Sequence, residues 1–157
     1  DYLIEALRRM EKQDVELVVF GQVKDDIRGL FPVPIHSMGY LSAESKIVAL
    51  YNAVDMFITS SLEENLPNTI MESMACGTPC VGFEIGGIPE MIDHRVNGYV
   101  ANYKDAGDLA NGIQWVLEHE DRLALSDACV KKVQENYTEE VVAKQYTTLY
   151  EKLLKGE

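Results

Sequence analysis

Short apolar runs alternate with helix-like segments along this chain, and that alternation constrains its fold more than any other feature of the sequence. The runs that look like buried strands are residues 16–21, 35–41, 55–59, 79–83 and 98–101. Segments with helical spacing of apolar residues or with helix-start residues lie at 2–12, 43–53, 67–76, 106–119, 120–136 and 139–154. Strands and helices in this order predict an α/β fold, with a parallel sheet and helices on both of its faces.

Four features that can form a binding site lie at the carboxyl ends of the predicted strands. They are Gly21, the turn after Gly39, the loop that holds Glu64, and the turn at Gly86-Gly87. Parallel sheets bind ligands beyond the carboxyl ends of their strands. We therefore expect all four features on one edge of the sheet, and we expect that edge to carry the functional site.

Two glutamates, Glu64 and Glu72, bracket the start of the helix predicted over residues 67–76. Glu64 is expected in the loop after a strand, and Glu72 about two turns into the helix, since each helical residue rises roughly 1.5 Å. The helix N-terminus between the two acids is a ready anion site. This arrangement predicts a ligand with phosphate in its middle and hydroxyl-bearing rings at both ends, which describes a nucleotide-sugar.

The residues around this helix start fit that interpretation. Asn65 can cap the helix, and Pro67 fits its first turn, where a missing N–H costs little. The N–H groups of Asn68 and Thr69 are then predicted to be unpaired and to face outward. Gly77 is expected to end the helix in the left-handed conformation.

The charge balance argues against one class of function. The chain has 14 Lys and Arg against 26 Asp and Glu, a formal net charge of −12, so a nucleic-acid-binding surface is not expected. Charge on this chain alone would not attract a pyrophosphate, and helix dipoles or basic residues from elsewhere would have to contribute. The odd number of cysteines and the lack of a histidine near Cys76 and Cys80 predict no disulfide framework and no metal site.

The length bounds the organisation of the chain. At 157 residues it has the size of one domain with a hydrophobic core. No run approaches the roughly 20 apolar residues that span a bilayer. Because the chain starts at Asp1, inside a helical pattern and without an initiator methionine, we interpret residues 1–157 as a single, N-terminally truncated domain.

Spacing alone leaves other interpretations of the two glutamates open. Glu72 can be a solvated helix residue and Glu64 an acid that complements a helix dipole, an effect of about 0.3–1 kcal/mol. A glycosidase pair fits less well, because its carboxylates flank one bond and need no helix N-terminus between them. A non-catalytic receiver-type or nucleotide-binding regulatory module needs acids clustered at an early strand end, whereas Asp55 begins its strand.

Together, these residues resemble a known family. Residues 60–79, residues 86–92 and the turn at Asn97-Gly98 resemble, in order, the signature of family 4 glycosyltransferases, which have the GT-B fold. Residues 39–42 resemble the turn that precedes a helix in this family, and residues 137–154 resemble its terminal helix. The resemblance implies the Rossmann-like C-terminal lobe of a two-lobed enzyme. Such enzymes transfer a hexosyl group from a nucleotide-sugar, with retention of configuration and without a metal or other cofactor.

The resemblance also implies roles for single residues. Glu64 is the expected catalytic residue beside the donor sugar, and Glu72 is expected to bind the ribose hydroxyls. The other expected donor-binding residues lie in the same motif, near the base, and at the glycine turns: Asn65, Leu66, Asn68, Thr69, Gly21, Tyr40, Leu41, Gly86 and Gly87. Family members often carry Phe-Gly where this chain has Leu66-Pro67. Pro67 has no N–H, so phosphate contacts must come from its neighbours.

The same resemblance implies partners and a location. The donor is expected to be a UDP- or GDP-sugar, and the acceptor is expected to bind a separate N-terminal lobe. The basic residues that hold the pyrophosphate in this family precede the first residue of the chain. A cytoplasmic location, with peripheral association of the longer protein with the inner face of the membrane, and a role in polysaccharide, glycan or glycolipid biosynthesis are implied as well.

Overall fold

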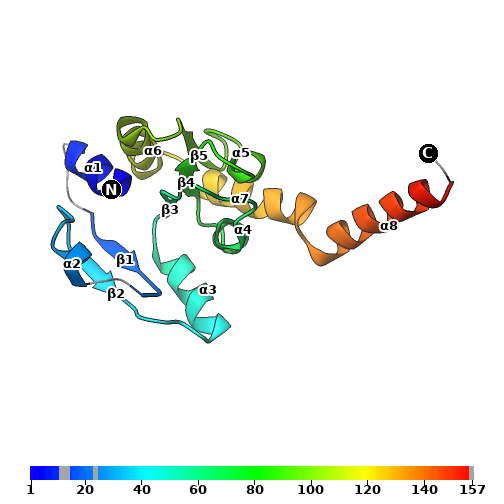
Figure 1. Cartoon of the computed structure of the whole chain (residues 1–157), viewed down its shortest axis with the longest axis horizontal. Coiled ribbons are helices and arrows are strands. Elements are labelled where there is room, and N and C mark those ends of the chain that lie inside the picture. The colour runs from blue at the N-terminus through cyan, green and yellow to red at the C-terminus, as the bar shows by residue number, and fades with distance from the viewer. Residues whose placement is uncertain (11–14, 23–24, 156–157) are drawn as a thin grey trace.

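The computed structural model describes residues 1–10, 15–22 and 25–155, which form an α/β fold (Figure 1). The strands are β1 (Leu17–Val19), β2 (Ile35–Ser37), β3 (Phe57–Thr59), β4 (Cys80–Phe83) and β5 (Gly98–Ala101). The helices are α1 (Tyr2–Arg9), α2 (Asp25–Arg28), α3 (Glu44–Ala53), α4 (Asn68–Ala75), α5 (Ile88–Met91), α6 (Ala106–Leu117), α7 (Arg122–Asn136) and α8 (Glu139–Lys155). The predicted α/β class is confirmed. The short helix α2 was not among the predicted helices.

All the strand pairs are parallel, as predicted. β1 pairs with β2, with Leu17 opposite Ile35. β4 lies between β3 and β5, and Cys80 is opposite both Phe57 and Gly98. Within the described residues β1 and β3 do not pair with each other, so the strands form two sheets where the sequence predicted one.

The three-stranded sheet is covered by helices on both faces, because successive side chains of its central strand point to opposite sides. Val81 and Phe83 of β4 belong to a core cluster that includes α1 and α6, whereas Cys80 belongs to a second cluster with α4, α5 and α7. Each of these three residues is fully buried. Burial of one large apolar side chain contributes about 1.5–3 kcal/mol, so β4 is the most firmly held strand.

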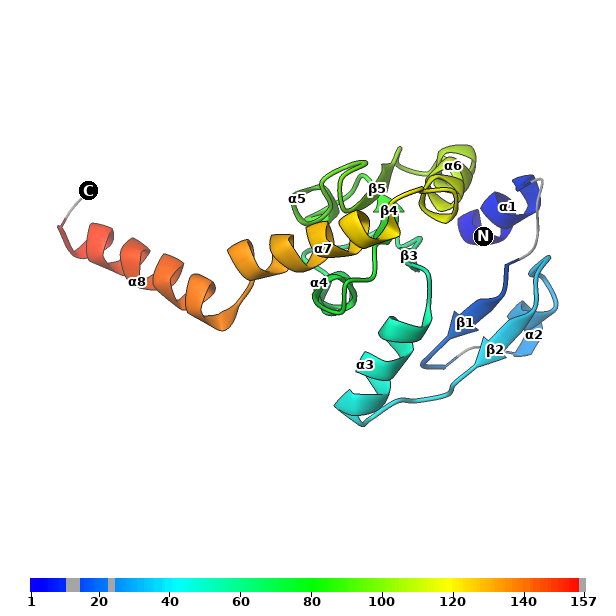
Figure 2. The same cartoon turned by 180° about the vertical axis from the view of Figure 1, so that it is seen from behind.

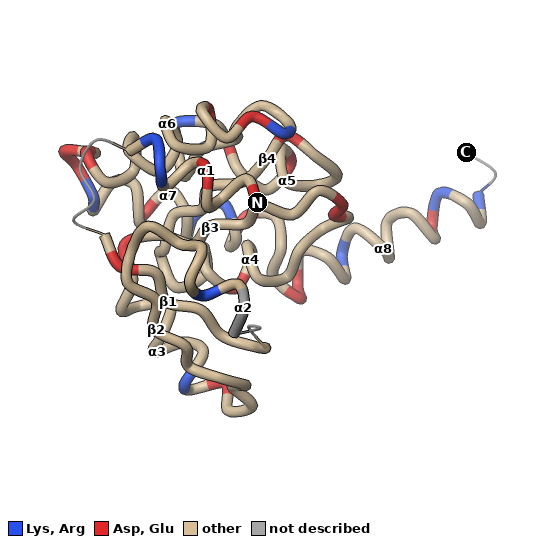
Figure 3. The backbone as a smooth tube through the Cα atoms, turned by 60° about the vertical axis from the view of Figure 1, so that its left-hand side comes forward, with Lys and Arg blue, Asp and Glu red and all other residues tan. Residues whose placement is uncertain are grey.

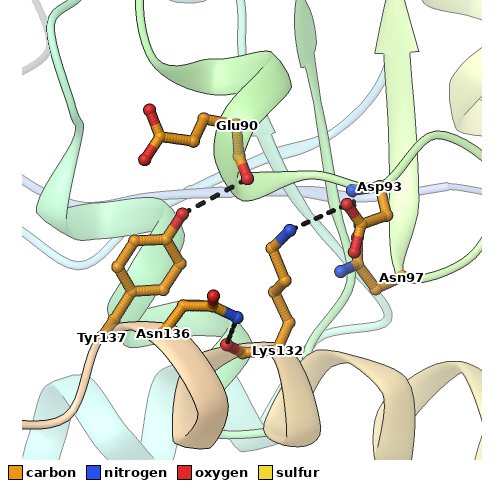
Figure 4. A network of polar contacts seen from close by, with 6 residues as sticks. All are labelled: Glu90, Asp93, Asn97, Lys132, Asn136 and Tyr137. Carbon is orange, nitrogen blue, oxygen red and sulfur yellow. Dashed lines mark hydrogen bonds and ion pairs between the residues drawn. The ribbon is translucent and has the colours of Figure 1, made fainter. Parts of the chain in front are cut away.

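A polar network ties α5 to α7 and so fixes the segment after β4 (Figure 4). The Lys132 ammonium lies 2.8 Å from the Asp93 carboxylate, and the Asp93 N–H donates to the Asn97 side-chain oxygen at 2.9 Å. The Tyr137 hydroxyl donates to the Glu90 carbonyl at 3.3 Å. The side chain of Lys132 is only 18% exposed, and a partly buried pair is screened less by salt than a surface pair. The end of α5 and the segment that follows it are therefore tied to α7.

Helix α8 has a different environment from the other helices. It extends away from the two sheets in both views (Figures 1 and 2), and none of its residues is buried. Its exposed apolar side chains are Tyr146, Leu149, Tyr150, Leu153 and Leu154. No helix in the described part of the chain is long and apolar enough to cross a membrane.

Candidate functional site

Helix α4 is held by its buried face, so its N-terminus has a fixed position after β3. Ile70 and Met74 are fully buried in the cluster that includes Cys80. The Ser73 hydroxyl donates to the Thr78 carbonyl at 3.1 Å beyond the helix end. Gly77 has φ of +76° and its N–H donates to the Met74 carbonyl at 2.9 Å, which confirms the predicted left-handed helix end.

The start of α4 is open, although not in the way the sequence predicted. The residue before the helix is Pro67, whose carbonyl accepts from the Ile70 N–H at 3.1 Å, and no side chain caps the helix. The prediction that Asn65 caps α4 is wrong, because Asn65 lies two residues too early in the chain. Among the described residues, no hydrogen bond is donated by the N–H groups of Asn68 and Thr69. These are the unsatisfied donors that an anion can accept.

The loop that carries Glu64 packs against the glycine turn after β4. The Gly87 N–H donates to the Asn65 carbonyl at 2.5 Å. Gly86 has φ of +54°, and a Cβ atom at this position would overlap the Glu64 carbonyl oxygen. A Cβ atom at Gly87 would lie 2.6 Å from Leu66 Cδ1. Two motifs that are far apart in the sequence thus meet at the carboxyl edge, and glycine is required there because only glycine lets the two backbones approach so closely.

A tyrosine that the sequence interpretation missed supports the same loop from β5. The Tyr103 hydroxyl donates to the Leu62 carbonyl at 3.1 Å, and its ring makes an edge contact with Phe83 at 6.5 Å between centroids. The Lys104 ammonium lies 4.9 Å from the centroid of the Tyr103 ring. An aromatic residue just after the last strand was the only sequence signal for this contact. The loop before α4 is therefore held by residues that follow both β4 and β5.

Glu72 is exposed on α4 and lies close enough to the buried Tyr51 of α3 to act on it electrostatically. The Tyr51 ring makes edge contacts with Phe20 and Phe57, with centroids 6.2 and 5.9 Å away. Burial, and after it the negative charge of Glu72, raise the pKa of Tyr51 well above its ordinary value. The Tyr51 hydroxyl has no hydrogen-bond partner of normal geometry among the described residues. Nothing in the local sequence indicates that Tyr51 lies beside Glu72.

The predicted residues at the ends of β1 and β2 lie in a separate part of the edge. The Gly21 N–H donates to the Gly39 carbonyl at 2.7 Å, which joins the two strand ends. Tyr40 is 84% exposed and Leu41 is half-buried. Within the described part of the chain, no hydrogen bond or ring contact joins Gly21, Tyr40 or Leu41 to the segment 64–72. Tyr51 lies between the two parts, because its ring contacts Phe20, next to Gly21, and its hydroxyl lies within electrostatic range of Glu72.

The segment that contains the open helix start carries no positively charged side chain. Residues 47–94 contain the whole segment between α3 and α5 and no lysine or arginine. Figure 3 shows Lys and Arg scattered along the described backbone, and the sequence has 14 of them against 26 Asp and Glu. Backbone amides are therefore the positive groups that this segment itself offers to an anion.

Known proteins share both the sequence pattern and the fold. The family model described as Glycosyl transferases group 1 matches residues 1–119. A relative named N-acetyl-alpha-D-glucosaminyl L-malate synthase, from Bacillus anthracis, is 29% identical over 75% of this chain and 31% of its own length. The N,N'-diacetylbacillosaminyl-diphospho-undecaprenol alpha-1,3-N-acetylgalactosaminyltransferase of Campylobacter jejuni is 34% identical over 74% of this chain and 31% of its own length. The chain thus spans about a third of these relatives.

Solved structures share the fold of this chain. A glycosyltransferase from Rickettsia africae superposes on 99% of this chain with a TM-score of 0.82 and 23% identity, over 44% of its own length. Anabaena HepE, solved in complex with UDP, superposes on 96% of this chain with a TM-score of 0.79 and 21% identity, also over 44% of its length. The predicted Rossmann-like fold of the GT-B enzymes is confirmed, and the chain belongs to the glycosyl transferases group 1 family.

Proposed function

We propose that this domain binds the nucleotide-sugar donor of a retaining hexosyltransferase. The observation that carries the proposal is the open start of α4, where the N–H groups of Asn68 and Thr69 have no partner among the described residues. An acid stands on either side of this helix start in the sequence. Solved structures of HepE with UDP and with UDP-glucose support a nucleotide-sugar as the ligand class.

The helix start is proposed to hold the donor diphosphate. The leaving nucleoside diphosphate gains negative charge in the transition state, and fixed donors aimed at that charge stabilise the transition state more than the ground state. Pro67 has no N–H, so the contacts come from the amides of Asn68 and Thr69 and from the helix dipole. With a net charge of −12 on the chain, the cations that complete this site come from the rest of the longer protein.

Glu64 is proposed as the catalytic residue. The residue is half-buried, and the loop that carries it is held by Gly87 and Tyr103. A carboxylate in a fixed position can bind the hydroxyls of the donor sugar and stabilise positive charge at the anomeric carbon. The contact between Gly86 and the Glu64 backbone gives that position its rigidity.

The remaining donor contacts are proposed on the other side of α4. Glu72 is proposed to accept hydrogen bonds from the ribose hydroxyls. Backbone atoms at Gly21, Tyr40 and Leu41 are proposed to meet the base, which has π-faces that suit the exposed Tyr40 ring. Asn65 and Leu66, with Gly86 and Gly87, form the wall beside the sugar.

The activity of the longer protein is part of the same proposal. We expect transfer from a UDP- or GDP-sugar, with no metal and no other cofactor, to an acceptor bound by an N-terminal lobe. A relative named amylovoran biosynthesis glycosyltransferase AmsK supports a role in polysaccharide, glycan or glycolipid assembly. The cytoplasmic location and the peripheral association with a membrane stay predictions.

Titration calorimetry tests the donor site directly. The chain is titrated with UDP and with GDP, beside the variants Glu72→Gln and Glu151→Gln. We expect weak binding of one nucleotide and a loss of about tenfold or more in affinity for Glu72→Gln, because a hydrogen bond to a charged group contributes about 1.5–3 kcal/mol. Glu151 is an exposed helix residue of α8 and serves as the control. Equal affinities for all three proteins, or binding of neither nucleotide, would contradict the proposal.

A further inference from the structure

Tyr51 of α3 has a fixed position and an unsatisfied hydroxyl. It is only 2% exposed. Its ring makes edge contacts with Phe20, which directly follows β1, and with Phe57 of β3. The buried Thr78 hydroxyl, beyond the end of α4, donates to the Tyr51 carbonyl at 2.7 Å. The ring and the backbone are therefore held from three segments, while the phenol oxygen has no hydrogen-bond partner of normal geometry among the described residues.

Glu72 is the group best suited to become the partner of this hydroxyl. Buried polar atoms are almost always hydrogen-bonded, so an exception calls for an acceptor that can move to it. The ionisable groups that act on Tyr51 electrostatically are Glu72, Cys76 and Cys80. The Cys80 thiol is directed at the Ile70 carbonyl, 3.8 Å away. Sulfur is a weak acceptor, whereas an ionised carboxylate accepts hydrogen bonds strongly.

Helix geometry places Glu72 where it can serve both Tyr51 and a ligand. Glu72 and Cys76 are four residues apart, so they lie on the same side of α4. This side meets α3, which contacts α4 and lies next to it in both views (Figures 1 and 2). Glu72 is also exposed. An exposed glutamate loses rotamer freedom when it binds a ligand, and a fixed donor beside it limits that loss.

We infer that Tyr51 is a positioning residue for Glu72, and that its hydroxyl donates to one carboxylate oxygen of Glu72 while the other oxygen accepts from the donor ribose. The inference rests on the proposed ribose contact of Glu72 and adds the residue that sets its geometry. A carboxylate accepts several hydrogen bonds through its two oxygens, so both contacts form together. Ribose binding orders the Glu72 side chain and gives the buried hydroxyl the partner that it lacks in the free chain.

The same residue connects the two proposed parts of the nucleotide site. The Tyr51 ring contacts Phe20, the neighbour of Gly21, whose backbone is proposed to meet the base. Its hydroxyl lies beside Glu72, which is proposed to meet the ribose. A single rigid side chain therefore spans the distance between the base contact and the ribose contact, and it fixes their spacing.

Titration calorimetry of the variant Tyr51→Phe tests the inference. UDP and GDP are each compared with an analogue that lacks both ribose hydroxyls. The parent chain should bind one nucleotide about tenfold or more tightly than its analogue, and Tyr51→Phe should reduce this ratio by about three- to tenfold. Affinity for the analogue should stay unchanged, whereas a merely structural role would weaken both ligands equally. In a Glu72→Gln background, Tyr51→Phe should not change the ratio further.

Tyr99→Phe is the matched control. Tyr99 is also buried, and its hydroxyl donates to the Asp108 carboxylate at 2.8 Å, outside the proposed site. This variant should leave the ratio of affinities unchanged. If the parent chain discriminates and Tyr51→Phe discriminates equally, the inference is overturned and the donor proposal stands. If the parent chain does not discriminate, or binds neither nucleotide, the ribose contact of Glu72 is absent and both are overturned.

Proton NMR of the unmutated chain gives a second measurement that needs no variant. With the nucleotide bound, the Tyr51 hydroxyl proton should exchange with water at least about tenfold more slowly than with the analogue bound, because only the ribose hydroxyls order Glu72 onto it. Equal exchange rates in the two complexes would overturn the inference.

Discussion

The half of the molecule built on β3, β4 and β5 differs from the half built on β1 and β2. In the first half β4 is buried at every residue, and the loops after its strands contact one another through Gly87 and Tyr103. In the second half the strand residues of β1 are only half-buried, and a groove of about 740 Å³ lies between β1 and β3. The proposed sugar and phosphate contacts therefore lie on a preformed scaffold, whereas the proposed base contacts lie on a less tightly packed part of the molecule.

The largest effect should come from the core, and a matched pair of phenylalanines measures it. Phe83 of β4 is fully buried, whereas Phe20 at the end of β1 is half-buried. Phe83→Ala should destabilise the chain by about 3–5 kcal/mol, the usual cost of a buried phenylalanine, and Phe20→Ala by less than half of that. Urea unfolding of both variants measures the difference. Equal costs would show that the two halves are equally well packed and would remove the contrast.

Glu64 should give the next largest effect, on catalysis and not on folding. In the longer enzyme, Glu64→Gln keeps the size of the side chain and removes its charge. We expect turnover of the donor to fall by about 10²–10³-fold, the range seen when one preorganised electrostatic contact to a transition state is lost. The Michaelis constant for the donor should change much less, since the affected charge develops only in the transition state. Steady-state release of nucleotide measures both constants, and a near-normal turnover number would end the catalytic assignment.

Two glycines with left-handed backbones separate strain from close contact. Gly86 has φ of +54° and lies against the Glu64 carbonyl, whereas Gly21 has φ of +91° and a Cβ atom there would meet nothing within 4 Å. Gly21→Ala should lower the free energy of unfolding by about 1–2 kcal/mol, because the alanine strains the backbone and meets no other atom. Gly86→Ala should lower the free energy of unfolding by about 2–4 kcal/mol, because its Cβ atom also overlaps the Glu64 carbonyl. Chemical denaturation measures the free energy of unfolding of the two variants. If Gly86→Ala is no less stable than Gly21→Ala, the Glu64 loop moves away from the new Cβ atom at little energetic cost.

Sequence reasoning predicted the five strands and the longer helices because both depend on local pattern. Apolar runs next to glycine or proline marked the strands, and Pro67 and Gly77 marked the two ends of α4 correctly. The prediction that Asn65 caps α4 was wrong because a local rule for capping residues takes no account of distant contacts. The Asn65 carbonyl accepts a hydrogen bond from the Gly87 N–H, so this residue belongs to the loop contact and not to the helix start. Local patterns do not determine the first residue of a helix to better than one or two positions.

The remaining features depend on contacts between distant segments. The local sequence places an aromatic residue after β5, but it does not indicate that the Tyr103 hydroxyl reaches Leu62 or that Gly86 lies against the Glu64 carbonyl. The separation of β1 from β3 also escaped prediction, because the pattern of apolar runs gives the number of strands and not their neighbours. Spatial order follows from tertiary packing, which single segments do not encode.

The smallest effect concerns pH and reports on the well-packed half alone. Burial raises the pKa of the Cys129 thiol from 9.0 to about 12. Above pH 9 the thiol of the unfolded chain loses its proton while that of the folded chain keeps it, so deprotonation favours the unfolded state. This contribution to the free energy of unfolding therefore falls as pH rises from about 9 to about 12, by at most about 1.4 kcal/mol per pH unit.

The variant Cys129→Ala isolates this contribution, since other buried groups titrate equally in both proteins. Cys129 lies in the same cluster as Ile70 and Cys80, so the variant is less stable at neutral pH because a buried side chain is lost. The gap in unfolding free energy between the parent chain and the variant should narrow by about 1 kcal/mol between pH 8 and pH 10. Urea titrations at the two values measure the gap. If the difference in unfolding free energy stays constant, the thiol ionises as easily in the folded chain as in the unfolded one. The cluster that contains Cys129 and Ile70 would then be accessible to water. The fixed position of the α4 start, on which the comparison of the two halves depends, would then lose its support.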